Sequence, residues 1–275
     1  MSMRLDLALV ERGRARSRNH AASLVDAGRV VVNGQPARKA SQPVTEDAEI
    51  SILEAIDYVS RAGHKLAGAL EAFPQIEIEG KLCLDVGAST GGFTEVLLRR
   101  GASKVVALDV GHDQMVPELR RNRKVINVEG FNARELSPES LRERTAEIGT
   151  TIDVAKEPIG IVVSDLSFIS LTLVLPAMYA VAPKADFVLL VKPQFEVGKT
   201  SLNAKGIVND HRLRAQSIKQ VVECAEGLGM EVHGIEKSLL PGTHGNQEYL
   251  LWISEKRSEY RPEWTERIDS LAKER

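Results

Sequence analysis

The chain has 275 residues, a length that allows one large domain or two ordinary ones. Its hydrophobic content of 43% and charged content of 27% are typical of a soluble globular protein, and a net charge of −2 provides no overall basic field for nucleic acid. Cys83 and Cys224 lie in apolar sequence without the spacing of a metal site or a disulfide framework. There is no signal segment and no long apolar run, so we expect a cytoplasmic protein that needs neither membrane nor metal.

The first 60 residues predict a small α+β module. Its expected elements, in chain order, are helices over residues 5–13 and 18–27 and strands over residues 30–32 and 44–53. Asn33-Gly34 follows the first of these strands, and both residues tolerate the positive φ of a tight hairpin turn.

Positive charge is concentrated in this module. Residues 1–40 contain eight basic and three acidic residues, a local excess of +5 in a chain that is acidic overall. Arg14, Arg16 and Arg18 alternate at the start of the second expected helix. Such a run can be a solvated helix face, but its concentration in one small module favours nucleic-acid binding that weakens with salt.

The run LCLDVGASTGGFT, residues 82–94, predicts a strand that ends in an acid, a turn of small residues and a helix that begins at Gly91-Gly92. Its glycines follow G-x-x-x-G-G rather than the dinucleotide spacing G-x-G-x-x-G, and no P-loop lysine follows. A carboxylate at Asp85 would repel a diphosphate and suits a cationic or hydroxyl-bearing ligand, which favours S-adenosylmethionine. A plain Rossmann turn and a purely structural corner are the alternatives.

After residue 61 the predicted strands and helices alternate. The expected strands are residues 82–86, 104–109, 125–128, 159–165, 187–192, 230–237 and 249–253. The expected helices are residues 92–100, 115–121, 137–147, 169–181 and 211–228. This order predicts an α/β fold with a Rossmann-like seven-stranded methyltransferase sheet at residues 61–253, between the small module at 1–60 and a charged tail at 254–275.

Polar residues follow several of these strands, where ligands bind in parallel sheets. Asp109 ends the second strand and can bind ribose hydroxyls of either NAD or S-adenosylmethionine. Asn132 follows the third strand and can contact an adenine edge or cap the next turn. Asp165 and Lys192 end the fourth and fifth strands, where a structural ion pair is the alternative to a catalytic one.

The N-terminal module resembles a known RNA-binding family. The pattern R-L-D-x-x-L, followed by S-R-x-x-A-x-x-L-V-x-x-G-x-V-x-V-N-G, runs from Arg4 to Gly34 and is similar to the domain of ribosomal protein S4. In that family the two helices and the hairpin face structured RNA. The resemblance implies RNA contacts at Arg4, Arg14, Arg18 and Lys39.

The larger module resembles FtsJ-like ribose 2′-O-methyltransferases. Lys65, Asp165, Lys192 and Glu248 occur in the order of that family's K-D-K-E tetrad, with V-K-P around the second lysine and N-x-E-Y around the glutamate. Together with the RNA-binding module, residues 3–253 resemble the TlyA family of bacterial rRNA cytidine 2′-O-methyltransferases, which are also described as hemolysins.

The resemblance implies a cofactor, a partner and a set of site residues. The cofactor is S-adenosylmethionine and the partner is ribosomal RNA or a ribosomal subunit. Lys192 assists removal of the hydroxyl proton as a base or as a stabiliser of the oxyanion, Asp165 orients it, and Lys65 and Glu248 fix the hydroxyl. The implied cofactor contacts are Asp85, Gly87, Ala88, Ser89, Thr90, Gly91, Gly92, Phe93, Asp109, Val110 and Asn132.

Some features leave room for other interpretations. His112-Asp113-Gln114 stands where the family has an aromatic-Gly-Gln run, and Phe131 replaces a small polar residue. Residues 194–208 form a long connection that we interpret as an RNA-closing lid or as simple disorder. The residues beyond 253 are expected to form a solvated surface helix, and contact with RNA is the alternative. An assembly protein with an inactive methyltransferase domain and a membrane-active hemolysin are the alternative functions.

Overall fold

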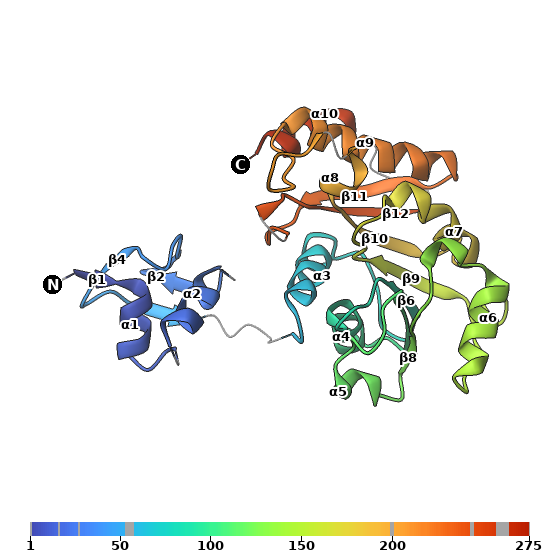
Figure 1. Cartoon of the computed structure of the whole chain (residues 1–275), viewed down its shortest axis with the longest axis horizontal. Coiled ribbons are helices and arrows are strands. Elements are labelled where there is room, and N and C mark those ends of the chain that lie inside the picture. Colours follow the sequence, from blue (N-terminus) through green and yellow to red (C-terminus); the bar gives the residue numbers. More distant parts are fainter. Residues whose placement is uncertain are drawn as a thin grey trace. The chain divides into compact units, whose positions relative to one another are not determined.

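The computed structural model describes residues 2–15, 17–26, 28–52, 58–198, 201–242, 245–256 and 264–274. The chain divides into two units, Met1–Asp57 and Tyr58–Arg275, which are described separately below (Figure 1).

The first unit contains two short helices and two small antiparallel sheets. Its elements are β1 (Ser2–Arg4), α1 (Leu5–Glu11), α2 (Arg18–Asp26), β2 (Val30–Val32), β3 (Gln35–Pro36), β4 (Pro43–Thr45) and β5 (Ile50–Ile52). Strand β1 pairs with β4, and β2 lies between β3 and β5. Asn33 and Gly34 have φ values of 49° and 75°, as the expected hairpin turn requires.

The prediction of one strand over residues 44–53 was wrong. Strands β4 and β5 pair in different sheets, separated by a turn in which Ala48 N donates to Thr45 O at 3.1 Å. Arg12, the residue directly after α1, fixes this turn, because its guanidinium donates to the carbonyls of Ala48 at 2.6 Å and Glu46 at 2.8 Å. Leu53, the last residue of the expected strand, lies outside the described residues.

The second unit is built on a seven-stranded sheet, which confirms the expected Rossmann-like fold. Its strands are β6 (Leu82–Val86), β7 (Lys104–Leu108), β8 (Val125–Val128), β9 (Ile159–Ser164), β10 (Asp186–Val191), β11 (Glu231–Lys237) and β12 (Tyr249–Ser254). Their order is β11-β12-β10-β9-β6-β7-β8, and β12 runs antiparallel to both of its neighbours. The strand order reverses between β6 and β9, which places a ligand crevice at the carboxyl ends of these two strands.

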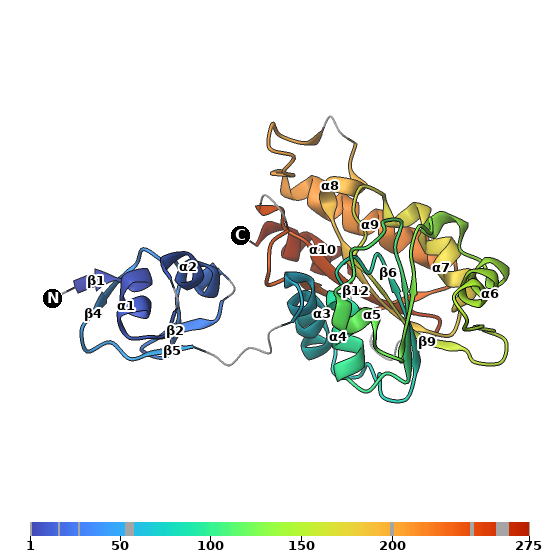
Figure 2. The same cartoon turned by 60° about the horizontal axis from the view of Figure 1, so that its bottom comes forward.

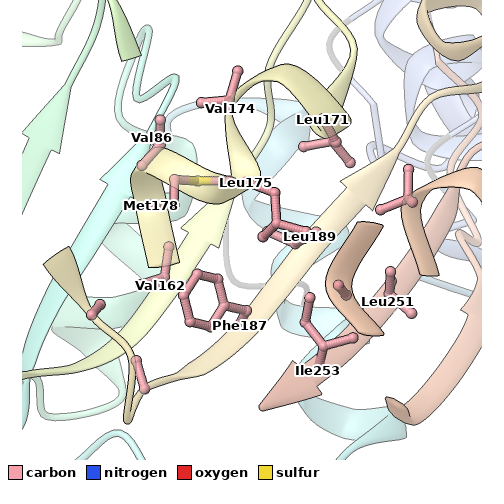
Figure 3. Close-up of a cluster of buried hydrophobic side chains, with 14 of the residues drawn as sticks. Val86, Val162, Leu171, Val174, Leu175, Met178, Phe187, Leu189, Leu251 and Ile253 are labelled. Atoms are coloured by element: carbon pink, nitrogen blue, oxygen red, sulfur yellow. The ribbon is translucent and has the colours of Figure 1, made fainter. Parts of the chain in front are cut away.

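Helices cover both faces of this sheet (Figure 2). The helical elements are α3 (Arg61–Ala72), α4 (Gly92–Arg99), α5 (Pro117–Arg120), η1 (Ala133–Glu135), α6 (Pro138–Glu147), η2 (Leu171–Leu173), α7 (Leu175–Val181), α8 (Pro193–Glu196), α9 (His211–Gly227) and α10 (Trp264–Lys273). Helices α3 and α4 pack on one face, and α6, α7 and α9 pack on the other. The larger core, on the α7 side, joins side chains such as Val86, Val162 and Phe187 of the strands to Leu175 and Met178 of α7 (Figure 3).

Two helical predictions needed correction. Helix α3 at residues 61–72 was not expected, although Leu66, Leu70 and Phe73 have helical spacing and are buried in α3 and just after it. The single helix expected over 169–181 is divided into η2 and α7. Pro176 lies in the first turn of α7 and has no N–H, so it cannot continue the hydrogen-bond ladder from η2.

Helix α10 corrects the interpretation of the tail as a solvated helix. Its Ile268, Leu271 and Ala272 are at most 2% exposed and belong to the larger core, where α10 packs along α9. Arg214 of α9 also donates to Ala272 O at 2.6 Å. The tail is therefore part of the structural unit of the sheet.

Candidate active site

Lys192 and Asp165 form an ion pair at the carboxyl edge of the sheet. They directly follow β10 and β9, which are parallel neighbours, so the two residues leave the sheet at the same edge. Lys192 Nζ lies 2.6 Å from Asp165 Oδ1 and donates to Ser167 Oγ at 2.9 Å. The side chains are 9% and 15% exposed, so little solvent screens the pair.

Lys65 and Glu248 form a second pair. Lys65 lies on α3 and Glu248 directly precedes β12. Lys65 Nζ donates to Glu248 Oε2 at 2.6 Å, and the two side chains are 10% and 2% exposed. The loop before Glu248 packs closely around it, because a Cβ on Gly242 would lie only 2.1 Å from Glu248 Oε1.

The register of the sheet brings the two pairs together. Strands β10 and β12 are antiparallel, with Val191 opposite Tyr249. Lys192 directly follows Val191 and Glu248 directly precedes Tyr249, so both residues leave this antiparallel pair of strands at the same edge. All four residues expected from the sequence therefore gather at one edge of the sheet, as two lysines and two carboxylates.

The loop of small residues after β6 lies against this cluster. Gly87 and Gly91 have φ values of 89° and 98°, which residues with a Cβ rarely adopt. A Cβ on Gly87 would lie 3.1 Å from the carbonyl oxygen of Asp165, and Asp165 N donates to Val86 O at 3.3 Å. The loop and the Lys192–Asp165 pair are thus direct neighbours.

Asp85 lies beneath this loop rather than on its surface. It shares the α4 side of β6 with Cys83, since side chains alternate along a strand, and it is fully buried. Thr94 Oγ1 donates to its Oδ2 at 2.6 Å, while Oδ1 has no hydrogen-bond partner within the described structure. Burial raises the pKa of Asp85 to about 7, against the lowering effect of the Thr94 hydrogen bond, and the charge of Asp165 raises it further.

The remaining loop residues differ in their exposure. Ala88, Gly91, Gly92 and Phe93 are buried, and the side chain of Phe93 packs into the core between α4 and the sheet. Ser89 is exposed and Thr90 is partly buried. Of this loop, only backbone atoms and the side chains of Ser89 and Thr90 are therefore placed to face a ligand.

Asp109 joins the loop to the end of β7. Its Oδ2 accepts from Ser89 N and its Oδ1 accepts from Gly111 N, both at 2.8 Å. Val110 beside it is 72% exposed, which is unusual for a valine. Asn132 is exposed and caps η1, since its Oδ1 accepts from Arg134 N at 3.1 Å. Asn132 therefore has the capping role that was one of its two expected roles, and because it is exposed its amide stays accessible to a ligand.

The departures from the family pattern have local explanations. Asp113 forms an ion pair with Arg120 at 2.8 Å and is 83% exposed, so its charge is directed to α5. His112 packs over Gly130, where a Cβ would lie 2.6 Å from His112 Nε2. Gln114 Oε1 accepts from Ser89 Oγ at 3.0 Å, and Phe131 is buried in the core.

Comparison with known proteins identifies both units. The FtsJ-like methyltransferase family matches residues 58–255, and the S4 domain family matches residues 3–50. The chain is 48% identical over 253 residues to the 16S/23S rRNA (cytidine-2'-O)-methyltransferase TlyA of Mycobacterium tuberculosis, which covers 91% of this chain and 89% of that protein. The chain belongs to the TlyA family.

Other TlyA-family relatives carry a different name. Hemolysin A of Brachyspira hyodysenteriae is 37% identical over 249 residues, or 90% of this chain and 98% of that protein. The solved structure of a candidate hemolysin from Streptococcus thermophilus has 33% identity and a TM-score of 0.69, with 98% of this chain and 94% of that chain covered. In the described part of this chain, no helix combines the length and apolarity needed to cross a membrane.

Two aromatic residues at the candidate active site were not predicted from the sequence. Phe168 is 91% exposed and has a φ of 67°, a strained conformation for a side chain of this size. Its ring centroid lies 5.2 Å from that of Phe195 on α8, and Lys192 Nζ lies 5.8 Å from the Phe195 centroid. Ser167, which binds Lys192, was missed as well, although it stands only two residues after Asp165.

The long connection after Lys192 is partly ordered by Asn246. This side chain is 3% exposed; its Oδ1 accepts from Val208 N at 3.1 Å and its Nδ2 donates to Gly206 O at 2.9 Å. The connection begins with the short helix α8, so the prediction of a segment without structure was only partly right. Lys199 lies outside the described residues, and closure over RNA stays a prediction.

The four predicted RNA contacts of the S4 domain fall into two classes. Arg4 and Arg18 both pair with the buried Asp6, at 2.9 and 3.1 Å, and these contacts hold the pKa of Asp6 well below its usual range. Arg14 and Lys39 are exposed and form no ion pair within the described residues. Arg4 and Arg18 thus have a structural role whether or not they touch RNA.

Proposed function

We propose that this protein transfers a methyl group from S-adenosylmethionine to the ribose 2′-oxygen of a cytidine in ribosomal RNA. The observation that carries the proposal is the pairing of Lys192 with Asp165 and of Lys65 with Glu248 at one sheet edge, against a glycine loop. The name of the M. tuberculosis relative supports the choice of rRNA and of cytidine. An rRNA substrate would place the protein with ribosomes in the cytoplasm.

The residues around the glycine loop fit this cofactor. Gly87 leaves open the space that a Cβ would fill beside Asp165, and the buried Asp85 Oδ1 has an unused lone pair under the loop. We assign the ribose of the cofactor to Asp109, its adenine to the exposed Val110 and Asn132, and its methionine part to the backbone of the loop above the buried Asp85. S-adenosylmethionine supplies an activated methyl group there, so the protein has mainly to position the acceptor oxygen in line with it.

Lys192 is the residue placed to act on the ribose hydroxyl. A lysine ammonium has three N–H donors; one goes to Ser167 Oγ and the ion pair with Asp165 engages at most one more, so at least one is left for a substrate oxygen. Such a donor stabilises the negative charge that develops on the 2′-oxygen as its proton leaves. This arrangement supports oxyanion stabilisation over the base role, because a base would first have to release a proton itself. Lys65 of α3 and Glu248 at the start of β12 would hold the hydroxyl from the other side.

The aromatic pair and the S4 domain supply RNA-binding surface. The exposed Phe168 ring, backed by Phe195, is suited to stack on an unpaired base next to Lys192. Arg14 and Lys39 of the S4 domain are free to contact phosphates of structured RNA.

The proposal is tested by mapping ribose methylation. The purified protein is incubated with S-adenosylmethionine and separate unmodified small and large ribosomal subunits, and methylated positions are read by nucleoside mass spectrometry and by resistance to alkaline cleavage. We expect 2′-O-methylcytidine at defined positions. Binding of the subunits without any methylation would instead support the assembly protein with an inactive domain.

The hemolysin names of two relatives favour a second candidate, a membrane-active protein. The same preparation is therefore assayed for erythrocyte lysis, with the Lys192→Ala variant alongside. Lysis by both forms at equal rates, with no rRNA methylation, would establish this candidate in place of methyl transfer.

A further inference from the structure

A cavity of about 300 Å³ lies beside Lys65, between one face of α3 and the end of β11. Its lining residues are His64, Lys65, Gly68, Glu71, Ala72, Glu236, Lys237, Leu239, Leu240 and Leu250. The α3 residues of this set recur at the spacing of one helix face. Lys65 lines the cavity and also donates to Glu248, so the cavity shares this lysine with the candidate active site.

Gly68 lies in the middle of this wall, at a position where the backbone conformation does not require a glycine. It lies inside α3, where glycine destabilises a helix relative to alanine, and its φ is not in the left-handed region. A Cβ added to Gly68 would meet no atom within 4 Å. No packing partner in the described structure therefore requires a glycine here, and its missing side chain keeps the cavity open.

The chemistry of the walls fits one nucleotide. Lys65 and Lys237 line the cavity, and Lys237 forms no ion pair within the described part of the chain. Leucines 239, 240 and 250 supply apolar surface for the flat face of a base, and Leu239 is 88% exposed at the rim.

Three carboxylates lie in or beside this wall, and that of Glu248 compensates the charge of Lys65. Glu236 forms an ion pair with Arg267 at 2.8 Å, which compensates its charge. Glu71 lies six residues along α3 from Lys65, about 9 Å at the rise of an α-helix. Lys237 forms no ion pair within the described residues and lies opposite Tyr249, next to Glu248, so it makes the end of the cavity beside the active site basic.

We infer that this cavity binds the nucleotide adjacent to the methylated one on the same RNA strand. The inference rests on the proposed function, because only a strand whose 2′-hydroxyl lies at Lys192 would continue past Lys65 into the cavity. Its phosphate would lie toward Lys237, and its base against the leucines. The subsite would thus fix the target ribose by holding the next link of its own backbone.

Filling the cavity from Gly68 tests the inference. Gly68→Leu places a side chain in the open space and keeps a good helix former, so we expect a folded protein whose KM for rRNA is raised at least tenfold and whose Kd for S-adenosylmethionine is unchanged. Gly68→Ala adds only a methyl group; its melting temperature should rise by about 2–4 °C with a much smaller change in KM. Gly227→Leu is the matched control, because a Cβ on Gly227 in α9 also meets nothing within 4 Å but lies outside the cavity.

A second variant and a modified RNA complete the test. Leu239→Trp fills the same cavity from its exposed rim and should reproduce the effect even if Gly68→Leu folds poorly. Removing the base of the flanking nucleotide on one side of the mapped target should raise KM for the wild type and have no further effect in Gly68→Leu. A wild-type KM in both cavity-filling variants would overturn the subsite. Absence of methylation by the wild type would instead contradict the proposed function.

Discussion

The ammonium of Lys65 and the carboxylate of Glu248 lie 2.6 Å apart although 183 residues separate them in the chain. Both side chains are nearly buried, so each is the principal charge compensation of the other. Removing one member of a buried pair leaves an uncompensated charge, which is more costly than removing both.

We therefore expect Lys65→Met to lower the free energy of unfolding by about 3–5 kcal/mol. The double variant Lys65→Met/Glu248→Gln should recover most of this loss while remaining inactive in methyl transfer. Urea denaturation of the two single variants and the double variant measures the coupling. Additive losses in the double variant would show that the pair is not energetically linked.

Asp85 should make the stability of the protein depend on pH. Its pKa is raised by burial to about 7 in the folded protein, above the ordinary value of 3.8, so its contribution to stability is fully present below pH 4 and is lost as the pH rises through about 7. Asp85→Asn keeps an oxygen acceptor for Thr94 and cannot ionise. At pH 8 this variant should be more stable than the wild type, by on the order of 2–4 kcal/mol, with no gain near pH 4. Equal pH dependence of the two proteins in urea denaturation would contradict the assignment.

Asn246 should order the connection between α8 and α9. Asn246→Ala leaves Val208 N and Gly206 O without partners, and each buried unsatisfied group costs about 1–3 kcal/mol. We expect lower stability and faster proteolytic cleavage between residues 201 and 210, together with reduced methyl transfer because Glu248 follows two residues later. Asn246→Asp retains the acceptor for Val208 and should have a smaller effect. Cleavage of Asn246→Ala at the wild-type rate would show that Asn246 does not order this connection.

Substitutions of the basic residues of the S4 domain should fall into two classes, one that weakens RNA binding and one that lowers stability. Arg14→Ala and Lys39→Ala should leave the melting temperature unchanged and weaken rRNA binding, each lowering the salt slope of log K by about one. Arg18→Ala should instead destabilise the S4 domain, because the buried Asp6 loses one of its two cations. Filter binding at several salt concentrations and thermal unfolding distinguish the classes. RNA affinity unaffected by Arg14→Ala and Lys39→Ala would place the RNA surface elsewhere.

The sequence predicted the sheet and the pair of Asp165 and Lys192 from local pattern, whereas Lys65 and Glu248 were assigned by the resemblance to the FtsJ-like family. Apolar runs such as 159–164 and 186–191 define buried strands, and a charge that directly follows each run must lie at the sheet edge. Parallel strands then bring Asp165 and Lys192 together without any further information. The glycine loop was recognisable for the same reason, since its positive-φ positions require particular residues.

Contacts over long sequence distance could not be predicted in this way. The hydrogen bond from Val208 to Asn246 spans 38 residues, and nothing in either segment specifies the other. Asp85 was expected at the ligand surface, but the alternation of β6 turns it toward Thr94 under α4. The space above Gly68 exists only because α3 packs beside the end of β11, which required the assembled fold.

The role of Lys192 in methyl transfer is tested most directly by comparing the wild type with Lys192→Ala on ribosomal subunits that carry the target. Nucleoside mass spectrometry measures 2′-O-methylcytidine, and calorimetry measures S-adenosylmethionine binding in both proteins. We expect ribose methylation by the wild type, none by Lys192→Ala, and equal cofactor affinity. Wild-type levels of ribose methylation by Lys192→Ala would contradict the role assigned to this lysine.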